Sequence, residues 1–506
     1  MNIERQRKGA SLLAAIGLVV NLGVGLVYTS FLVRLLGKSE YGLYQLVLSV
    51  VNYLNLMNFG FSGSYIRYYT EAIKKGREQI SRINGMFLSV FVTISCLCIV
   101  MGVALYANID IMGRNITYNE YELARKLVIP LVLNIAVMFA NTIFVAFMSA
   151  NSEFVIQKIV NIISNIILPI ITIPLLLGGG GALSVAYTTL GISFLKLVFN
   201  LYYCIKKLCM QIQLFYFDRR LLIDIGKYTF FIFLSDIVDQ MNTNVDKFLL
   251  GRINGTYSVA LYSVGFDIRT YFTQITWIIP ELFIPEVTRI AVSEKNDRKL
   301  NYIFQKLGRY NNYIILLIIS GFFIVGKEFI VLWVGKEYEI SYYITVILLL
   351  ACYIPAVQTI GVNIQNAKDM HRVRSVVYLG IACFNVVCSI FLIQWNGGIG
   401  ASVGTLLAMV LGHGVFMNIY YYKKVKLDVI EFWKKLSKWS IIVFFISGIG
   451  YILKKMIDVK NWGSLFIFIC IYTIIYTLTF CFYILKYYKI NVYKEIFNVK
   501  KIDRKE

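Results

Sequence analysis

Long apolar segments, each about as long as a membrane is thick, alternate with short polar loops along this chain. Each segment fits the roughly 17–25 residues that an α-helix needs to cross a hydrocarbon core of about 30 Å. In lipid, only helices and closed barrels satisfy every backbone polar group, and continuous apolar runs favour helices over strands of period two. The sequence therefore predicts an all-α polytopic membrane protein.

Fourteen such segments can be read in the 506 residues. Lysine and arginine alternate between them: with the N-terminus placed inside, the inward segments hold 36 of the 50 and the outward loops 11, and the other three, Lys196, Lys247 and Arg269, fall inside spans. Because cytoplasmic loops carry an excess of basic residues, this alternation predicts a multi-pass protein with both termini cytoplasmic. The segments lie near 11–33, 41–62, 83–107, 126–149, 154–177, 182–205, 225–250, 257–285, 310–333, 341–363, 373–395, 399–422, 437–457 and 463–485.

The composition narrows the classes of function. The chain is 58% hydrophobic and 15% charged, and its net charge is +22. The basic residues lie in loops, where lipid headgroups account for them, so nucleic acid is not expected as a partner. The nine cysteines form no C-x-x-C pair, and His371 and His413 are the two histidines. These counts predict no disulfide framework, no metal site and no cofactor.

Two parts of the sequence repeat at an offset of 218 residues. Residues 32–44 resemble 250–262, and Asn200 with its following tyrosines aligns with Asn418 in the same way. The offset covers six spans, so both copies run in the same direction. This predicts a parallel repeat, with an N-lobe at 1–220 (spans 1–6), a C-lobe at 221–425 (spans 7–12) and a C-terminal helix pair with a basic tail at 426–506. Chance similarity among membrane helices is the alternative.

Ionisable residues at membrane depth cost roughly 2.5–3.5 kcal/mol each, so they usually face a partner or a wet cavity. Spans 7 and 8 each carry a polar stripe at helical spacing, which predicts the wall of a hydrated cavity. The five acidic residues in these stripes are candidates for binding a coupling ion, and structural ion pairs between helices are the alternative. The stripes consist of Asp236, Asp239, Thr243 and Asp246, and of Asp267, Tyr271, Gln274 and Glu281.

At this point the chain resembles the polysaccharide transport family, the Wzx-type oligosaccharide flippases of the multidrug/oligosaccharidyl-lipid/polysaccharide exporter superfamily. The resemblance is carried by the segments 17–37, 39–44 and 58–61 and by the glycine-rich loop 397–401, and it extends diffusely over the chain. It implies two six-helix lobes, often with two extra helices. It also implies translocation of an undecaprenyl-diphosphate-linked oligosaccharide repeat unit across the bacterial cell membrane by alternating access, for cell-surface polysaccharide biosynthesis. Membrane lipids, a polysaccharide polymerase and glycosyltransferases are the other candidate partners.

Cations within or beside the spans are the candidates for contact with the anionic diphosphate of such a substrate. Each could instead form a structural pair, and no family motif decides between the two. The four candidates are Arg34, Lys196, Lys247 and Arg269.

Two other functions fit a polytopic chain. A cation-coupled multidrug or metabolite antiporter of the same superfamily would need an apolar or acidic pocket. A membrane polysaccharide polymerase would need catalytic carboxylates in an outer loop. The outer stretch 108–125 offers Asp110, Glu120 and Glu122, which we interpret as ordinary solvated charges. The sequence therefore favours a transporter over an enzyme.

Overall fold

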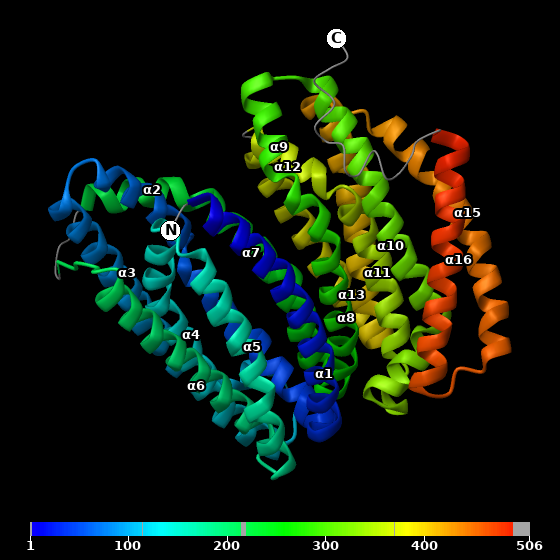
Figure 1. Cartoon of the computed structure of the whole chain (residues 1–506). Coiled ribbons are helices and arrows are strands. Elements are labelled where there is room, and N and C mark those ends of the chain that lie inside the picture. Colours follow the sequence, from blue (N-terminus) through cyan, green and yellow to red (C-terminus); the bar gives the residue numbers. More distant parts are fainter. Residues whose placement is uncertain (1–2, 114, 214–218, 369, 489–506) are drawn as a thin grey trace. The chain divides into compact units, whose positions relative to one another are not determined.

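The computed structural model describes residues 3–113, 115–213, 219–368 and 370–488, and these ranges consist of helices joined by short turns and loops, with no strand among them (Figure 1). This confirms the predicted all-α class. The helices are α1 (Ile3–Val51), α2 (Phe61–Ile73), α3 (Arg77–Ala107), α4 (Tyr118–Ala150), α5 (Phe154–Leu177), α6 (Gly181–Tyr202), α7 (Arg219–Asn254), α8 (Thr256–Leu282), α9 (Ile284–Arg289), α10 (Asp297–Val334), α11 (Ser341–Val357), α12 (Thr359–Ala367), α13 (His371–Met409), α14 (Asn418–Tyr420), α15 (Val429–Ile457) and α16 (Trp462–Tyr488).

Each of the fourteen predicted spans is mainly helical in the described chain, although 41–62, 257–285 and 341–363 each cross a short turn. By length and apolar composition, ten stretches of these residues could cross a membrane. Two of the ten, 16–73 and 373–425, are broken at Gly37 and Gly397 and so hold two predicted spans each. The helices α7 and α8 are outside the ten, and these two carry the predicted polar stripes.

Backbone conformation repeats at the offset that the sequence repeats. Gly37 (φ 68°) and Gly255 (φ 82°) both take the left-handed conformation, and each ends one helical span and begins the next. Gly179 (φ 84°) and Gly397 (φ 50°), also 218 residues apart, do the same at a later turn. Glycine adopts this conformation without the steric cost that a Cβ atom adds. The repeated sequence therefore encodes repeated turns.

A rarer structural feature recurs at the same offset of 218 residues. The π-helical segments Tyr203–Lys207 and Tyr421–Val425 lie at equivalent positions of the two copies. Two further π-helical segments, Ile290–Glu294 and Val410–Met417, have no counterpart at this offset among the described residues, so the match adds to the glycine turns and does not decide for duplication by itself. The lobe boundaries at 220 and 425 stay a prediction.

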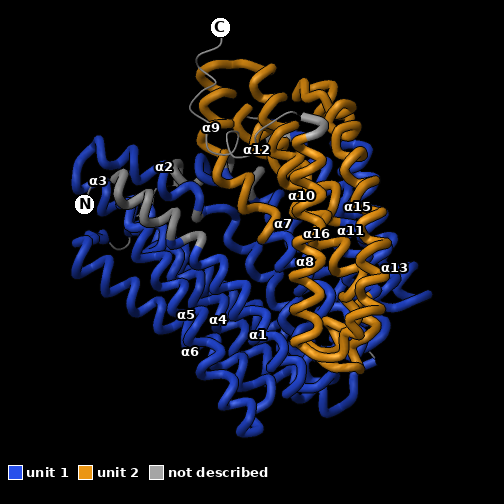
Figure 2. The backbone as a smooth tube through the Cα atoms, turned by 45° about the vertical axis from the view of Figure 1, so that its right-hand side comes forward, with its two compact units in different colours: residues 1–274, 343–351, 369–417 blue, residues 275–342, 352–368, 418–506 orange. Residues whose placement is uncertain are grey.

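By packing, the chain divides into two compact units, coloured separately in Figure 2. Unit 1 contains residues 1–274, 343–351 and 369–417, and unit 2 contains residues 275–342, 352–368 and 418–506. In unit 1, α4 packs against α3 and α6, α1 packs along α5, and α7 packs along α13.

In unit 2, the C-terminal helices α15 and α16 pack on α10 through an aromatic core. Trp439 Nε1 donates to Tyr476 OH (3.1 Å), and Tyr476 OH donates to the backbone oxygen of Tyr313 (2.9 Å). Tyr472 OH donates to Ser320 Oγ on α10 (2.8 Å). Trp439, Tyr472 and Tyr476 are buried, so each polar tip needs and finds a partner within the core. These bonds make α10, α15 and α16 one packed block.

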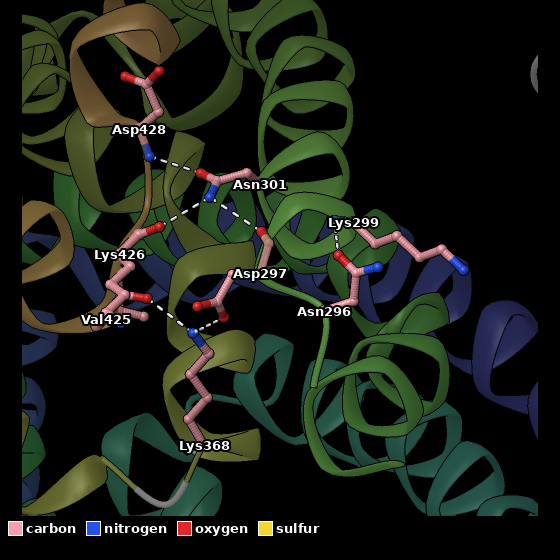
Figure 3. Close-up of polar contacts among 8 residues, drawn as sticks. All are labelled: Asn296, Asp297, Lys299, Asn301, Lys368, Val425, Lys426 and Asp428. Carbon is pink, nitrogen blue, oxygen red and sulfur yellow. Dashed lines mark hydrogen bonds and ion pairs between the residues drawn. The ribbon is translucent and has the colours of Figure 1, made fainter. Parts of the chain in front are cut away.

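A set of polar contacts that we call the α10 clasp fixes the start of α10 to its neighbours in unit 2 (Figure 3). Lys368 Nζ lies 2.7 Å from Asp297 Oδ1, which joins the end of α12 to the first turn of α10. Asn301 donates to the backbone oxygen of Lys426 (2.9 Å) and accepts from the backbone N–H of Asp428 (2.7 Å). The clasp therefore orders the connection that leads into α15.

Candidate functional site

Buried polar side chains of unit 1 form a continuous chain of hydrogen bonds where α1, α7 and α8 meet. Lys247 Nζ on α7 donates to Gln45 Oε1 on α1 (3.0 Å), and Gln45 Nε2 donates to Tyr41 OH (3.1 Å). Tyr41 OH then donates to Asp267 Oδ2 on α8 (3.0 Å). We call these four residues the polar seam. It connects a buried cation to a carboxylate through two neutral side chains.

A glycine makes the polar seam possible. A Cβ atom on Gly42 would overlap the backbone carbonyl of Thr256, so only glycine allows α1 to come this close to the start of α8. The flanking residues Tyr41 and Gln45 are thereby brought within hydrogen-bonding distance of α7 and α8.

Two cations share one aromatic ring beside the polar seam. Lys247 Nζ lies 4.9 Å from the centroid of the Phe266 ring, and the guanidinium carbon of Arg269 lies 4.8 Å from the same centroid. Each contact is worth roughly 0.5–2 kcal/mol, which partly offsets the cost of burying the cation. Two like charges on one ring repel each other, and an anion that contacted both would relieve this repulsion. The pair is therefore suited to a phosphate or diphosphate group.

A second polar cluster surrounds Asp246, next to Lys247 on α7. The carboxylate is buried, and it accepts hydrogen bonds from Tyr262 OH (2.9 Å), Ser389 Oγ (2.8 Å) and Thr405 Oγ1 (3.0 Å). These three partners are hydroxyl groups. Carboxylate and hydroxyl oxygens suit a proton or a small hard cation better than a soft metal.

The two hydroxyls on α13 reach Asp246 because the two halves of that helix lie very close together. A Cβ atom on Gly404 would come within 2.9 Å of Ser389 Oγ, and one on Gly400 would overlap the backbone carbonyl of Leu392. Small residues four apart allow this close approach of membrane helices. Ser389 and Thr405 can then bind one carboxylate from opposite sides of the turn at Gly397.

A third polar group joins the two repeated turns of unit 1. Glu120 Oε1 accepts from Ser39 Oγ (2.6 Å) and from Thr256 Oγ1 (2.7 Å), while Glu120 also completes a capping box with Thr117 at the start of α4. We call Ser39, Glu120, Thr117 and Thr256 the turn clasp. Interpreting Glu120 as an ordinary solvated charge was wrong, because its carboxylate ties both repeats together. Glu122, by contrast, is exposed and pairs with Lys126 one turn along the helix.

Comparison with known proteins now places the chain in a family. A family model with the description "Polysaccharide biosynthesis protein" matches residues 31–342. The chain belongs to this polysaccharide biosynthesis protein family. The match confirms the resemblance to polysaccharide transport proteins that the sequence segments carry.

Two relatives of this chain have names that describe transport proteins. A candidate flippase of Haloferax volcanii is 20% identical over 398 residues, which cover 77% of this chain and 78% of the relative. A candidate O-antigen transporter of Shigella flexneri is 21% identical over 400 residues, which cover 75% of this chain and 90% of the relative.

Solved structures share the fold of this polysaccharide biosynthesis protein. The lipid II flippase MurJ in an inward closed conformation matches with a TM-score of 0.76 at 18% identity, over 94% of this chain and 99% of that one. The multidrug transporter DinF-BH of the MATE family matches with a TM-score of 0.60 at 14% identity, over 83% and 96% of the two chains. At these identities the likeness concerns the fold.

The structure brings three of the predicted site residues, Lys247, Asp267 and Arg269, together around Phe266 and the polar seam. The other candidates lie at separate positions, and their roles stay predictions. In unit 1, Arg34 is exposed on α1, and Lys196 is half-buried on α6 without a hydrogen-bond or ion-pair partner among the described residues. On α7, Asp236 is half-buried and Asp239 is exposed. Glu281 is exposed in the part of α8 that belongs to unit 2.

Sequence reasoning missed the neutral members of the site. Only Tyr262 carried a signal, because it is paired with Tyr44 in the repeat. The remaining ones are residue types that fill membrane helices everywhere, and the close approaches that give them partners depend on packing. They are Tyr41, Gln45, Phe266, Ser389 and Thr405.

Proposed function

We propose that this chain is a flippase that carries an undecaprenyl-diphosphate-linked oligosaccharide across the membrane for cell-surface polysaccharide biosynthesis. It acts by alternating access, as a transporter and not as an enzyme. The family membership and the names of the two relatives support this proposal. The fold shared with a lipid II flippase agrees with it.

The single observation that carries the proposal is the pair of cations on the Phe266 ring. The guanidinium of Arg269 can bind phosphate oxygens in a bidentate manner, and Lys247 adds a point charge. The lipid tail needs no polar partner and can stay in the hydrocarbon. Arg34 and Lys196 remain further candidates for contact with the anionic headgroup.

We also propose that acidic residues couple transport to an ion. Asp246 is the foremost candidate, since its three hydroxyl partners form a small oxygen-lined cluster. Asp267 contributes through the polar seam, where any change in its protonation is passed to Lys247 through Tyr41 and Gln45. Asp236, Asp239 and Glu281 are retained as coupling candidates from the sequence stripes.

The proposed flippase works in the bacterial cell membrane with both termini in the cytoplasm, as the basic loops predict. Glycosyltransferases that build the repeat unit would supply its substrate. A polysaccharide polymerase on the other side of the membrane would consume the product.

The test is leaflet exchange in liposomes. Purified protein is reconstituted with a fluorescent polyprenyl-diphosphate oligosaccharide, and a membrane-impermeant quencher reports the fraction of lipid in the outer leaflet over time. Wild-type protein should accelerate exchange relative to protein-free liposomes. Absence of acceleration, together with uptake of small organic cations driven by an ion gradient, would instead support the antiporter of the same superfamily.

A further inference from the structure

Three amide side chains from three helices of unit 1 form an unbroken row. Asn165 Nδ2 on α5 donates to Asn21 Oδ1 on α1 (3.4 Å), and Asn21 Nδ2 donates to Gln274 Oε1 on α8 (3.4 Å). We call these residues the amide ladder. Asn21 is exposed, and the other two are half-buried.

The amide ladder lies near the middle of the membrane. Helix α5 has 24 residues, and Asn165 occupies its centre. At about 1.5 Å per residue, each end of α5 is therefore roughly 18 Å away. No other hydrogen bond of these three side chains occurs among the described residues.

Each amide can donate two hydrogen bonds and accept two, so the ladder leaves most of its capacity unused. Acyl chains cannot satisfy such groups, and leaving them unsatisfied in hydrocarbon is costly. The ladder must therefore face water or a polar solute on its exposed side. A purely structural role does not explain this exposure: another amide–amide contact between helices of unit 1, from Asn200 Nδ2 to Asn141 Oδ1 (3.0 Å), involves the buried Asn200.

The ladder is on the same side of α8 as the polar seam. Gln274 follows Asp267 by seven residues, which is two helical turns or about 10 Å. Between them, Tyr271 OH lies 3.0 Å from Thr29 Oγ1 on α1, so polar contacts between α1 and α8 continue from the seam to the ladder. A headgroup whose diphosphate contacts Lys247 and Arg269 can thus extend its sugars to the ladder.

We propose that the amide ladder binds the sugars of the substrate, with a preference for neutral, hydroxyl-rich residues. This inference rests on the proposed flippase function. An amide offers a donor and an acceptor side by side, which matches a sugar hydroxyl that is itself both. Because the ladder has no charge, it adds nothing to the attraction for the diphosphate. It discriminates by hydrogen bonds alone.

The experiment compares two fluorescent lipids in the liposome exchange assay: a polyprenyl diphosphate carrying a neutral disaccharide, and the same lipid without sugar. The variants Asn21→Leu and Gln274→Met remove the amides while roughly keeping shape. Each should slow exchange of the disaccharide lipid about three- to tenfold, the equivalent of one or two lost hydrogen bonds, and leave the sugarless lipid within about twofold of wild type. Asn21→Gln, which restores an amide, should recover much of the rate.

Asn200→Leu is the matched control, since it removes an interhelical amide contact away from the ladder. It should change the exchange rates of the two lipids by the same factor. If the Asn21→Leu protein does not insert into the membrane, Asn165→Leu takes its place in the same comparison of the two lipids. Equal slowing of both lipids by the ladder variants, or no slowing of either, would overturn the sugar subsite alone. Wild-type protein that moves neither lipid would overturn the subsite together with the proposed function.

Discussion

Lys247 shows at the residue scale how this protein keeps a cation within the membrane. Its side chain is buried, and removing a single charge from water costs several kcal/mol unless partners replace the solvent. Gln45 supplies a hydrogen bond, the Phe266 ring supplies a cation–π contact, and Asp267 supplies the opposite charge through two intervening side chains. None of these residues forms a direct ion pair with Lys247, so its ammonium group keeps N–H donors for a ligand.

We therefore expect Arg269→Ala and Lys247→Ala each to lower the rate of leaflet exchange at least about tenfold, because a charge-assisted contact to phosphate is worth roughly 1.5–3 kcal/mol. Both variants should still insert into the membrane. The measurement is exchange rate per reconstituted protein, with insertion checked by membrane fractionation.

Lys455→Ala, at an exposed position on α15, is the control and should retain the wild-type rate. Full activity in both Arg269→Ala and Lys247→Ala would remove these two residues from the substrate site.

Asp246 gives a prediction about energy coupling at the same scale. Asp246→Asn keeps the size of the side chain and removes its negative charge, so a coupling cation or proton loses its main ligand. Exchange should persist without a gradient and should lose its response to an imposed sodium or proton gradient. Asp224→Asn, exposed near the start of α7, should respond as wild type does. An unchanged gradient response in Asp246→Asn would exclude this carboxylate as the coupling site.

At the scale of elements, glycines and the turn clasp determine how the helices of unit 1 meet. Gly42 lets α1 approach the start of α8, and Glu120 then joins Ser39 of the first turn to Thr256 of its repeat. The same carboxylate caps α4 with Thr117. One side chain therefore fixes three helix ends.

Glu120→Ala should lower the free energy of unfolding by about 1–3 kcal/mol, because it removes one half of the capping box of α4 and leaves the hydroxyls of Ser39 and Thr256 without their acceptor. The measurement is the melting temperature of the purified protein in detergent. Glu122→Ala is a matched control two residues away, where only an exposed contact with Lys126 is lost, and its melting temperature should stay at the wild-type value. Equal melting temperatures for the two variants would show that the turn clasp contributes no stability.

The helices were predictable from the sequence, and the contacts of the site were not. Segment 154–177 was predicted with the bounds that α5 has, since an apolar run between the short polar turn 151–153 and a glycine-rich loop specifies a span. The start of α10 was placed thirteen residues too late, because its first turns are amphipathic and depend on the cap at Asn296. Gln45 could not be recognised, since an isolated polar residue in a helix gains its role only from Lys247 across a close helix contact.

At the scale of the whole chain, the duplication predicts membrane sidedness. Gly181 and Ala182 pack on Glu40, and Gly397 packs near Asn254, next to the repeated turn at Gly255. The two later turns therefore both adjoin the earlier turns in unit 1.

In a cysteine-free background, Gly178→Cys and Asn396→Cys should react with an impermeant thiol reagent added from the same side of the membrane. Asn366→Cys, at the end of α12, should react from the opposite side. Labelling of positions 178 and 396 from opposite sides would contradict the parallel repeat.

The aromatic core that fixes α15 and α16 to α10 has a practical consequence for following the transport cycle. Cys481 on α16 is a native, exposed thiol that lies next to this core. Once the other exposed cysteines among the described residues, Cys96, Cys209 and Cys383, are replaced, a spin label or fluorophore attached there would move with α10. The C-terminal helix pair thus offers a native labelling site for measuring the rate of conformational change during transport.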